Sequence, residues 1–123
     1  MKPDLTSLLG RTVTLTVDRP LGTAHPRHPD LIYPVNYGFL PDVTGGDGEA
    51  QDVYILGVDA PVERFTGVVI AIVHRADDVE DKLVAAPAGM TFTVAQIEQA
   101  VRFQERFFAH TVELVHINET YDT

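Results

Sequence analysis

The sequence contains no cysteine among its 123 residues. Disulfide bonds, thiolate metal sites and thiol nucleophiles are therefore excluded. Cations are also scarce, because 9 lysines and arginines stand against 18 acidic residues and leave a net charge of −9. This balance argues against nucleic acid as a partner, since such binding depends on cationic neutralisation of phosphates. A small phosphate-containing substrate is not excluded, because bound metal ions can reverse the local charge.

Long hydrophobic runs are absent as well. No stretch is long enough to span a bilayer, and residues 1–5 lack the cationic start and long apolar core of a signal peptide. We therefore expect a soluble, cytoplasmic protein with no membrane partner. The length and the 45% hydrophobic content indicate one domain, residues 1–123, with enough chain to bury a core.

The most informative stretch is the acidic segment 45–52, Gly-Gly-Asp-Gly-Glu-Ala-Gln-Asp. Its carboxylates Asp47, Glu49 and Asp52 precede an apolar, β-favouring run at 53–56. Glycines allow the sharp turns that bring such side chains to one point. Carboxylates held together repel one another unless a cation lies among them, and Mg²⁺ prefers oxygen ligands. The segment therefore indicates a Mg²⁺ site, and a solvated acidic turn is the alternative that remains open.

Alternation and short apolar runs predict a series of strands. Val13, Leu15 and Val17 alternate with threonines, as in a half-buried strand. Further strands are predicted at residues 53–56, 68–73, 83–86 and about 112–117. Alternation before the third of these places Glu80 and Lys82 on one side of the chain. Several strands followed by one helix indicate a mainly β fold, a five-stranded OB-like barrel with a C-terminal helix packed outside.

The predicted helix begins after Thr93 and runs to about residue 109. Thr93 and Gln96 have the spacing of a capping box, and apolar residues recur at helical spacing behind them. We expect this apolar face to cover the barrel or a partner subunit. Three phenylalanines lie close together near the helix end: Phe103, Phe107 and Phe108. This apolar load predicts a homo-oligomer, and the alternative is that all three rings fill the intramolecular core.

Two segments are predicted to lack regular structure. Residues 18–30 contain three prolines and a glycine, and residues 32–41 contain two prolines and a glycine. We therefore expect a loop followed by an irregular extended segment. The loop holds the densest group of cations in the chain: Arg19, His25, Arg27 and His28. These side chains form either a phosphate clamp or scattered surface charges.

Three blocks of sequence together resemble the soluble family I inorganic pyrophosphatases. They are Tyr-Pro-Val-Asn-Tyr-Gly-Phe at 33–39, Asp-Gly-Glu-Ala-Gln-Asp-Val at 47–53 and Lys-Leu-Val-Ala-Ala-Pro at 82–87. The similarity runs from about residue 13 to 112 and is sharp between 32 and 87. It implies a five-stranded barrel that hydrolyses inorganic pyrophosphate with several Mg²⁺ ions, or with Mn²⁺ in their place. No nucleic-acid or membrane partner is implied.

The resemblance also implies roles for individual residues. The metal ligands of the family match Asp47, Asp52, Asp77 and Glu80. The catalytic set matches Glu49, which orients or deprotonates the water, together with Asp52, Lys82 and Tyr37. The substrate contacts match Lys82, Tyr33 and Tyr37, to which we add the loop cations Arg19, Arg27 and His25. An early glutamate of the family corresponds to Asp18.

The chain departs from the family pattern in its cations. The phosphate-binding arginine has no certain match, the late Tyr-Lys pair falls on Thr111 and Val112, and Ala50 replaces a proline. The chain is also shorter, and the loop 18–30 stands where the family has a hairpin. Two alternatives to pyrophosphate hydrolysis therefore stay open. One is hydrolysis of another phosphoanhydride, such as a nucleotide, and the other is a non-catalytic module that binds metal or phosphate.

Overall fold

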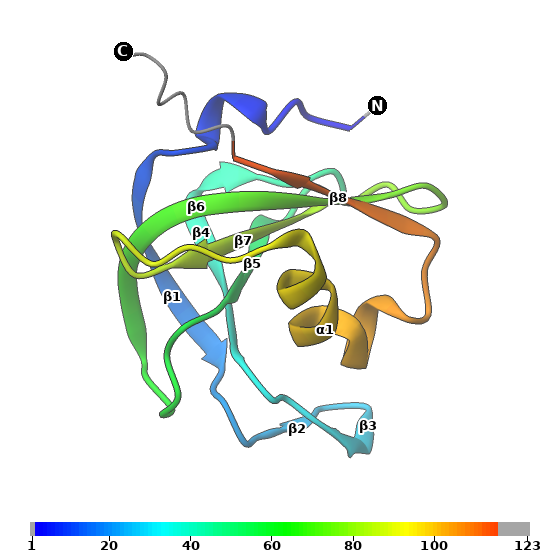
Figure 1. Ribbon diagram of the computed structural model, residues 1–123. Helices are drawn as coiled ribbons and strands as arrows, with labels where there is room; N and C mark the ends of the chain where they lie inside the picture. Colours follow the sequence, from blue (N-terminus) through cyan, green and yellow to red (C-terminus); the bar gives the residue numbers. More distant parts are fainter. Residues whose placement is uncertain (1, 116–123) are drawn as a thin grey trace.

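The computed structural model describes residues 2–115 and contains a closed five-stranded barrel (Figure 1). The barrel strands are β1 (Thr12–Arg19), β4 (Asn36–Thr44), β5 (Ala50–Ile55), β7 (Lys82–Ala86) and β6 (Arg64–Arg75). They pair in the order β1-β4-β5-β7-β6, and β6 pairs with β1 to close the barrel. All these pairs are antiparallel except β5–β7. The predicted mainly β barrel with a C-terminal helix is confirmed.

Five smaller elements surround the barrel (Figure 1). They are the 3₁₀ turn η1 (Thr6–Leu8), the hairpin strands β2 (Ala24–His25) and β3 (His28–Ile32), the helix α1 (Val94–Glu105) and the strand β8 (His110–Leu114). Strand β8 extends the sheet beyond β6. His116 and Ile117, included in the predicted last strand, lie outside the described residues. No helix within residues 2–115 is long and apolar enough to cross a membrane.

The central strands are buried on both faces, which explains their continuous apolar runs. In β5, Val53 and Ile55 pack inside the barrel with Leu15, whereas Tyr54 points to the opposite face. That outer face packs against Ile97 and other apolar residues of α1. Alternation along each strand therefore supplies two cores, one within the barrel and one beneath the helix.

The helix begins as predicted and ends earlier. Thr93 Oγ1 accepts a hydrogen bond from the Gln96 backbone N–H, and Gln96 Oε1 accepts one from the Thr93 N–H, so the capping box is confirmed. The helix ends at Glu105 instead of about residue 109. After that point the N–H groups of Phe107 and Phe108 bond three residues back, which tightens the chain before it extends into β8.

The prediction that residues 18–30 form a loop is wrong. Strand β1 continues to Arg19, and β2 and β3 then pair as a small hairpin. Its prolines do not prevent pairing, because Pro26 lies in the turn and Pro29 lies in a strand with a single partner. The predicted irregular segment 32–41 is also wrong from Asn36 onwards, where β4 begins. Pro41 is tolerated because the β4–β5 register shifts between Leu40 and Thr44.

The outer side of β6 carries an ionic cluster. Asp81 Oδ1 accepts hydrogen bonds from Lys2 Nζ at 2.7 Å and from the Arg75 backbone N–H at 3.0 Å. The His74 ring bonds two carboxylates: its Nδ1 lies 3.1 Å from Asp81 Oδ2, and its Nε2 lies 2.8 Å from Glu113 Oε1. This cluster holds the N-terminal segment and β8 against β6.

His74 should make stability depend on pH. Partial burial alone would lower the pKa of His74, but its bonds to Glu113 and Asp81 outweigh that effect and raise the pKa. The imidazolium therefore stabilises the fold at low pH, and this contribution is lost as the pH rises through the raised pKa. We expect His74→Asn to lower the free energy of unfolding more at about pH 5.5 than at about pH 8.5. Urea titrations at both pH values test this, and an equal loss at both would contradict it.

Candidate functional site

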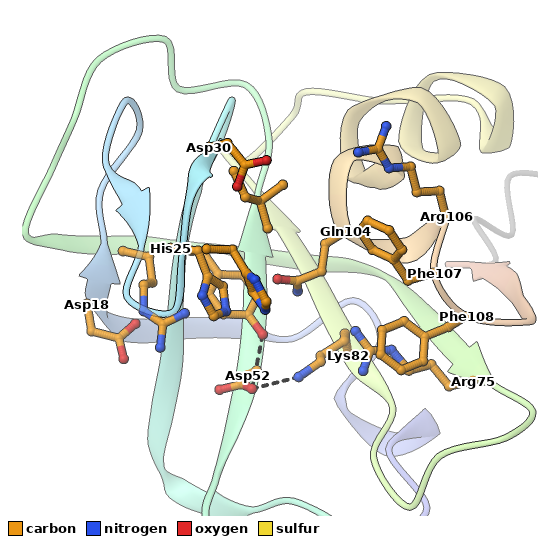
Figure 2. A pocket seen from close by; sticks show the side chains of 14 residues that line it. Asp18, His25, Asp30, Asp52, Arg75, Lys82, Gln104, Arg106, Phe107 and Phe108 are labelled. Atoms are coloured by element: carbon orange, nitrogen blue, oxygen red, sulfur yellow. Dashed lines mark hydrogen bonds and ion pairs between the residues drawn. The ribbon is translucent and has the colours of Figure 1, made fainter.

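One pocket of about 690 Å³ lies between the hairpin β2–β3 and the C-terminal end of α1 (Figure 2). Its floor is formed by side chains of β4, β5, β6 and β7: Tyr37, Asp52, Arg75 and Lys82. One wall comes from the end of β1 and the hairpin: Asp18, Arg19, His25, His28, Asp30 and Leu31. The other wall comes from α1 and the turn after it: Gln104, Arg106, Phe107 and Phe108. The pocket thus collects residues from distant parts of the sequence.

The floor is organised by Lys82. Its Nζ lies 2.7 Å from Asp52 Oδ2 and 2.7 Å from Glu80 Oε1, and its side chain is almost fully buried. Tyr37 Oη donates a hydrogen bond of 3.0 Å to the same oxygen of Asp52. Burial, followed by the charge of Asp52, raises the pKa of Tyr37 well above its usual value, so this hydroxyl stays protonated. The structure therefore brings together four of the residues predicted for the site.

A glycine contact brings the acidic loop to these residues. A Cβ built on Gly46 would lie 1.8 Å from the backbone oxygen of Val79, so this close approach requires glycine. The contact sets the loop against the segment that carries Glu80. Burial raises the pKa of Glu80, Lys82 lowers it, and the charges of Asp52 and Asp47 raise it further. Asp47 therefore adds to the negative field around Glu80.

Gly46→Ala should open this contact. The new methyl group would meet rigid backbone, and overpacking of this kind costs about 1–3 kcal/mol. We expect a loss of that size in urea titrations. Gly45→Ala is the matched control, because its Cβ would come no closer than 3.2 Å to the Gln51 side-chain oxygen and 3.4 Å to the Glu49 backbone oxygen. Equal losses in the two variants would contradict the role given to Gly46.

Arg19 forms the cationic part of the hairpin wall. Its Nη1 donates a hydrogen bond of 2.8 Å to Tyr33 Oη, and Tyr33 Oη in turn donates a hydrogen bond of 3.3 Å to Gln104 Oε1. Tyr33 is itself buried behind the pocket and does not line it. His25 Nδ1 accepts a bond from the Arg27 backbone N–H, which leaves the proton on Nε2. Burial, followed by the neighbouring Arg19, His28 and Arg27, lowers the pKa of His25, so it lines the pocket as a neutral ring.

Several predicted site residues lie elsewhere. Arg27 is exposed at the hairpin turn and does not line the pocket. Asp47 and Glu49 are exposed in the acidic loop, where Asp47 Oδ1 caps the Glu49 N–H at 3.0 Å. Asp77 is exposed in the turn after β6, whereas its neighbour Asp78 accepts a 2.9 Å bond from Arg75. The roles assigned to these residues remain predictions.

The pocket also contains residues that the sequence analysis did not identify. Arg75 lies at the end of β6, and its Nε and Nη2 donate to the two carboxylate oxygens of Glu105 at 3.0 and 2.6 Å. Its guanidinium stacks 3.7 Å from the centre of the Phe108 ring. Glu105 also accepts a 2.6 Å bond from Tyr54 Oη. The only sequence signal was an arginine at the end of an apolar run and a glutamate on the apolar side of the helix.

Chain comparisons point to one family of enzymes. The chain is 31% identical over 115 residues to an inorganic pyrophosphatase from Aquifex pyrophilus, and the match takes in 84% of this chain and 62% of that protein. The chain thus spans less than two thirds of that relative. No protein-family model matches the chain. The sequence resemblance to inorganic pyrophosphatases is confirmed by this relative.

Solved structures share the fold. An inorganic pyrophosphatase from Ehrlichia chaffeensis superimposes with a TM-score of 0.65 at 16% identity, covering 87% of this chain and 88% of that chain. One from Neisseria gonorrhoeae has a TM-score of 0.57 at 21% identity, covering 92% and 88%. One from Helicobacter pylori has a TM-score of 0.59 at 16% identity, covering 89% and 86%. These likenesses confirm the barrel predicted from the sequence.

Proposed function

We propose that the chain is an inorganic pyrophosphatase that hydrolyses pyrophosphate to two phosphates in a Mg²⁺-dependent reaction. The observation that carries this proposal is the grouping of Asp52, Lys82 and Tyr37 at the floor of one pocket, with Glu80 paired to Lys82. These are the residue types that the family resemblance assigns to metal and phosphate, and the barrel is of the same type.

The donor set fits a hard divalent cation. One oxygen of Glu80, Oε2, is buried without a hydrogen-bond partner among the described residues. Burial is the main cause of the raised pKa of Glu80, and the negative charges of Asp52 and Asp47 raise it further. A bound cation would offset the repulsion among these carboxylates. Within residues 2–115, no group of three or more such ligands is already assembled for a metal ion. Lys82 instead takes the position between Asp52 and Glu80.

Asp47, Asp52 and Glu80 would hold the ion, with Asp77 as the further ligand implied by the resemblance. A bound divalent ion supplies positive charge to the phosphate oxygens and makes a water molecule more acidic. Lys82 neutralises phosphate charge from the floor, and Arg19 does so from the wall. Tyr37 holds Asp52 in place through its hydroxyl. Glu49 would orient the attacking water. Phosphoanhydride cleavage needs mainly such positioning and charge stabilisation.

Phosphate release from pyrophosphate with Mg²⁺ or Mn²⁺ tests the proposal. We expect metal-dependent hydrolysis, and a melting temperature that rises with millimolar Mg²⁺ because the ion binds only the folded state. Asp52→Asn should lose most of both effects. The exposed Asp42→Asn serves as the control, since Asp42 lies outside the pocket. Metal binding without hydrolysis would favour the non-catalytic module, and an unchanged melting temperature in wild type would remove the metal site.

A further inference from the structure

The pocket is larger and more aromatic than inorganic pyrophosphate requires. Its volume of about 690 Å³ lies within the roughly 300–1,000 Å³ typical of pockets that enclose organic ligands. Rings stand on both sides of the polar floor, with His25 on the hairpin and Phe107 and Phe108 beyond α1 (Figure 2). Pyrophosphate has no apolar surface to pack against them.

Phe107 stands out among these rings. Phe107 is 64% exposed, whereas Phe103 packs against Tyr33 and Tyr54 and Phe108 stacks on Arg75. The intramolecular core therefore does not account for Phe107. Because Phe107 also lines the pocket, its exposed ring is accessible to a ligand bound there.

Cations free of carboxylate partners lie beside the rings. Within residues 2–115, neither Arg19 nor Arg106 forms an ion pair with a carboxylate. The guanidinium of Arg106 lies 4.9 Å from the centre of the Phe107 ring. Lys82, in contrast, is bound to two carboxylates at the floor. Positive charge and flat apolar surface therefore occur together at the walls, a combination that suits a ligand with both phosphates and an aromatic group.

The geometry points to nucleoside polyphosphates as substrates of this pocket, with the outer phosphate at the Lys82 floor and the base against Phe107. His25 fits this arrangement as a neutral ring on the facing wall. The inference rests on the proposed function, because it uses the same phosphoanhydride chemistry. The oxygen of water would bond to the outer phosphorus while the bond from that phosphorus to the bridging oxygen breaks. A nucleoside triphosphate would give a nucleoside diphosphate, inorganic phosphate and one proton released to solvent.

The test compares kcat/KM for pyrophosphate and for ATP and GTP, with Mg²⁺, in wild type and Phe107→Ala. We expect wild type to hydrolyse a nucleotide, and the ratio of nucleotide to pyrophosphate kcat/KM to fall about tenfold in Phe107→Ala, as when a base loses its aromatic platform. Met90→Ala is the control, because Met90 is an exposed apolar residue outside the pocket. It should leave the ratio unchanged. Melting temperatures verify that both variants are folded.

The outcomes separate the two proposals. Hydrolysis of pyrophosphate without any nucleotide hydrolysis overturns this inference and leaves the proposed function standing. Hydrolysis of a nucleotide but not of pyrophosphate overturns the proposed function and leaves this inference standing, provided that kcat/KM for the nucleotide falls in Phe107→Ala. An unchanged ratio in Phe107→Ala overturns the inference. If wild type is an oligomer in sedimentation and Phe107→Ala is a monomer, Phe107 is a contact between copies of the chain and the inference is overturned.

Discussion

Glu105→Ala should destabilise the folded protein by about 3–5 kcal/mol, the cost of leaving a buried charge without its partner. The carboxylate of Glu105 is fully buried and accepts three hydrogen bonds, two from Arg75 and one from Tyr54. Without it, the guanidinium of Arg75 keeps only one carboxylate partner among residues 2–115, Asp78, and the Tyr54 hydroxyl loses its hydrogen-bond acceptor. Urea unfolding of wild type and variant at neutral pH gives the difference directly.

A second carboxylate on the same helix provides the control. Glu98 pairs with His110 at 2.7 Å, and its side chain is 40% exposed, so Glu98→Ala should cost no more than about 1 kcal/mol. The double variant Arg75→Met with Glu105→Leu should be more stable than Glu105→Ala, because it removes both charges and refills the space. A Glu105→Ala loss no greater than that of Glu98→Ala would show that the buried pair contributes little.

Local patterns predicted the parts of the fold that local contacts determine. The capping box of Thr93 and Gln96, the alternation at Val13, Leu15 and Val17, and the apolar run of β7 are all present as predicted. The hairpin and β4 were missed because proline was taken to exclude strands. Pro29 is accommodated because its strand has only one partner, and Pro41 because the β4–β5 register shifts beside it. Neither feature has a signal in the local sequence.

The candidate site also contains residues that the sequence predicted and residues that only tertiary packing brings together. Asp52 was predicted from the acidic segment before a strand, and Glu80 and Lys82 were assigned from the family resemblance. The structure brings the three side chains within bonding distance. Arg75 and Glu105 are 30 residues apart and meet only because α1 folds back onto β6. Their pairing depends on tertiary packing, which no spacing in the sequence encodes. The same holds for Arg19 and Gln104, which meet through Tyr33.

Lys82→Ala should lower kcat/KM for pyrophosphate by about tenfold to a hundredfold, because a lost charge-assisted hydrogen bond costs about 1.5–3 kcal/mol. Its ammonium lies at the pocket floor between the carboxylates of Asp52 and Glu80. Removing it leaves Asp52 and Glu80 without that charge, so Mg²⁺ should raise the melting temperature of the variant at least as much as it does in wild type. Loss of activity with metal binding retained would identify Lys82 as a phosphate contact. Loss of both activity and metal binding would assign Lys82 a structural role.

Arg19→Ala should lower kcat/KM for pyrophosphate by at least about tenfold, equivalent to about 1.4 kcal/mol. The family's late Tyr-Lys pair corresponds here to Thr111 and Val112 in β8, which pair with β6 and do not line the pocket. Arg19 lines it without a carboxylate partner among residues 2–115, so its charge is available to the substrate. Arg27→Ala is the comparison, because Arg27 carries the same charge on the same hairpin but lies exposed outside the pocket. Steady-state kinetics of the two variants decide between a specific clamp and a general field. If Arg19→Ala and Arg27→Ala lose equal activity, Arg19 acts only through the overall charge of the hairpin. If neither variant loses activity, the hairpin does not replace the missing phosphate contacts.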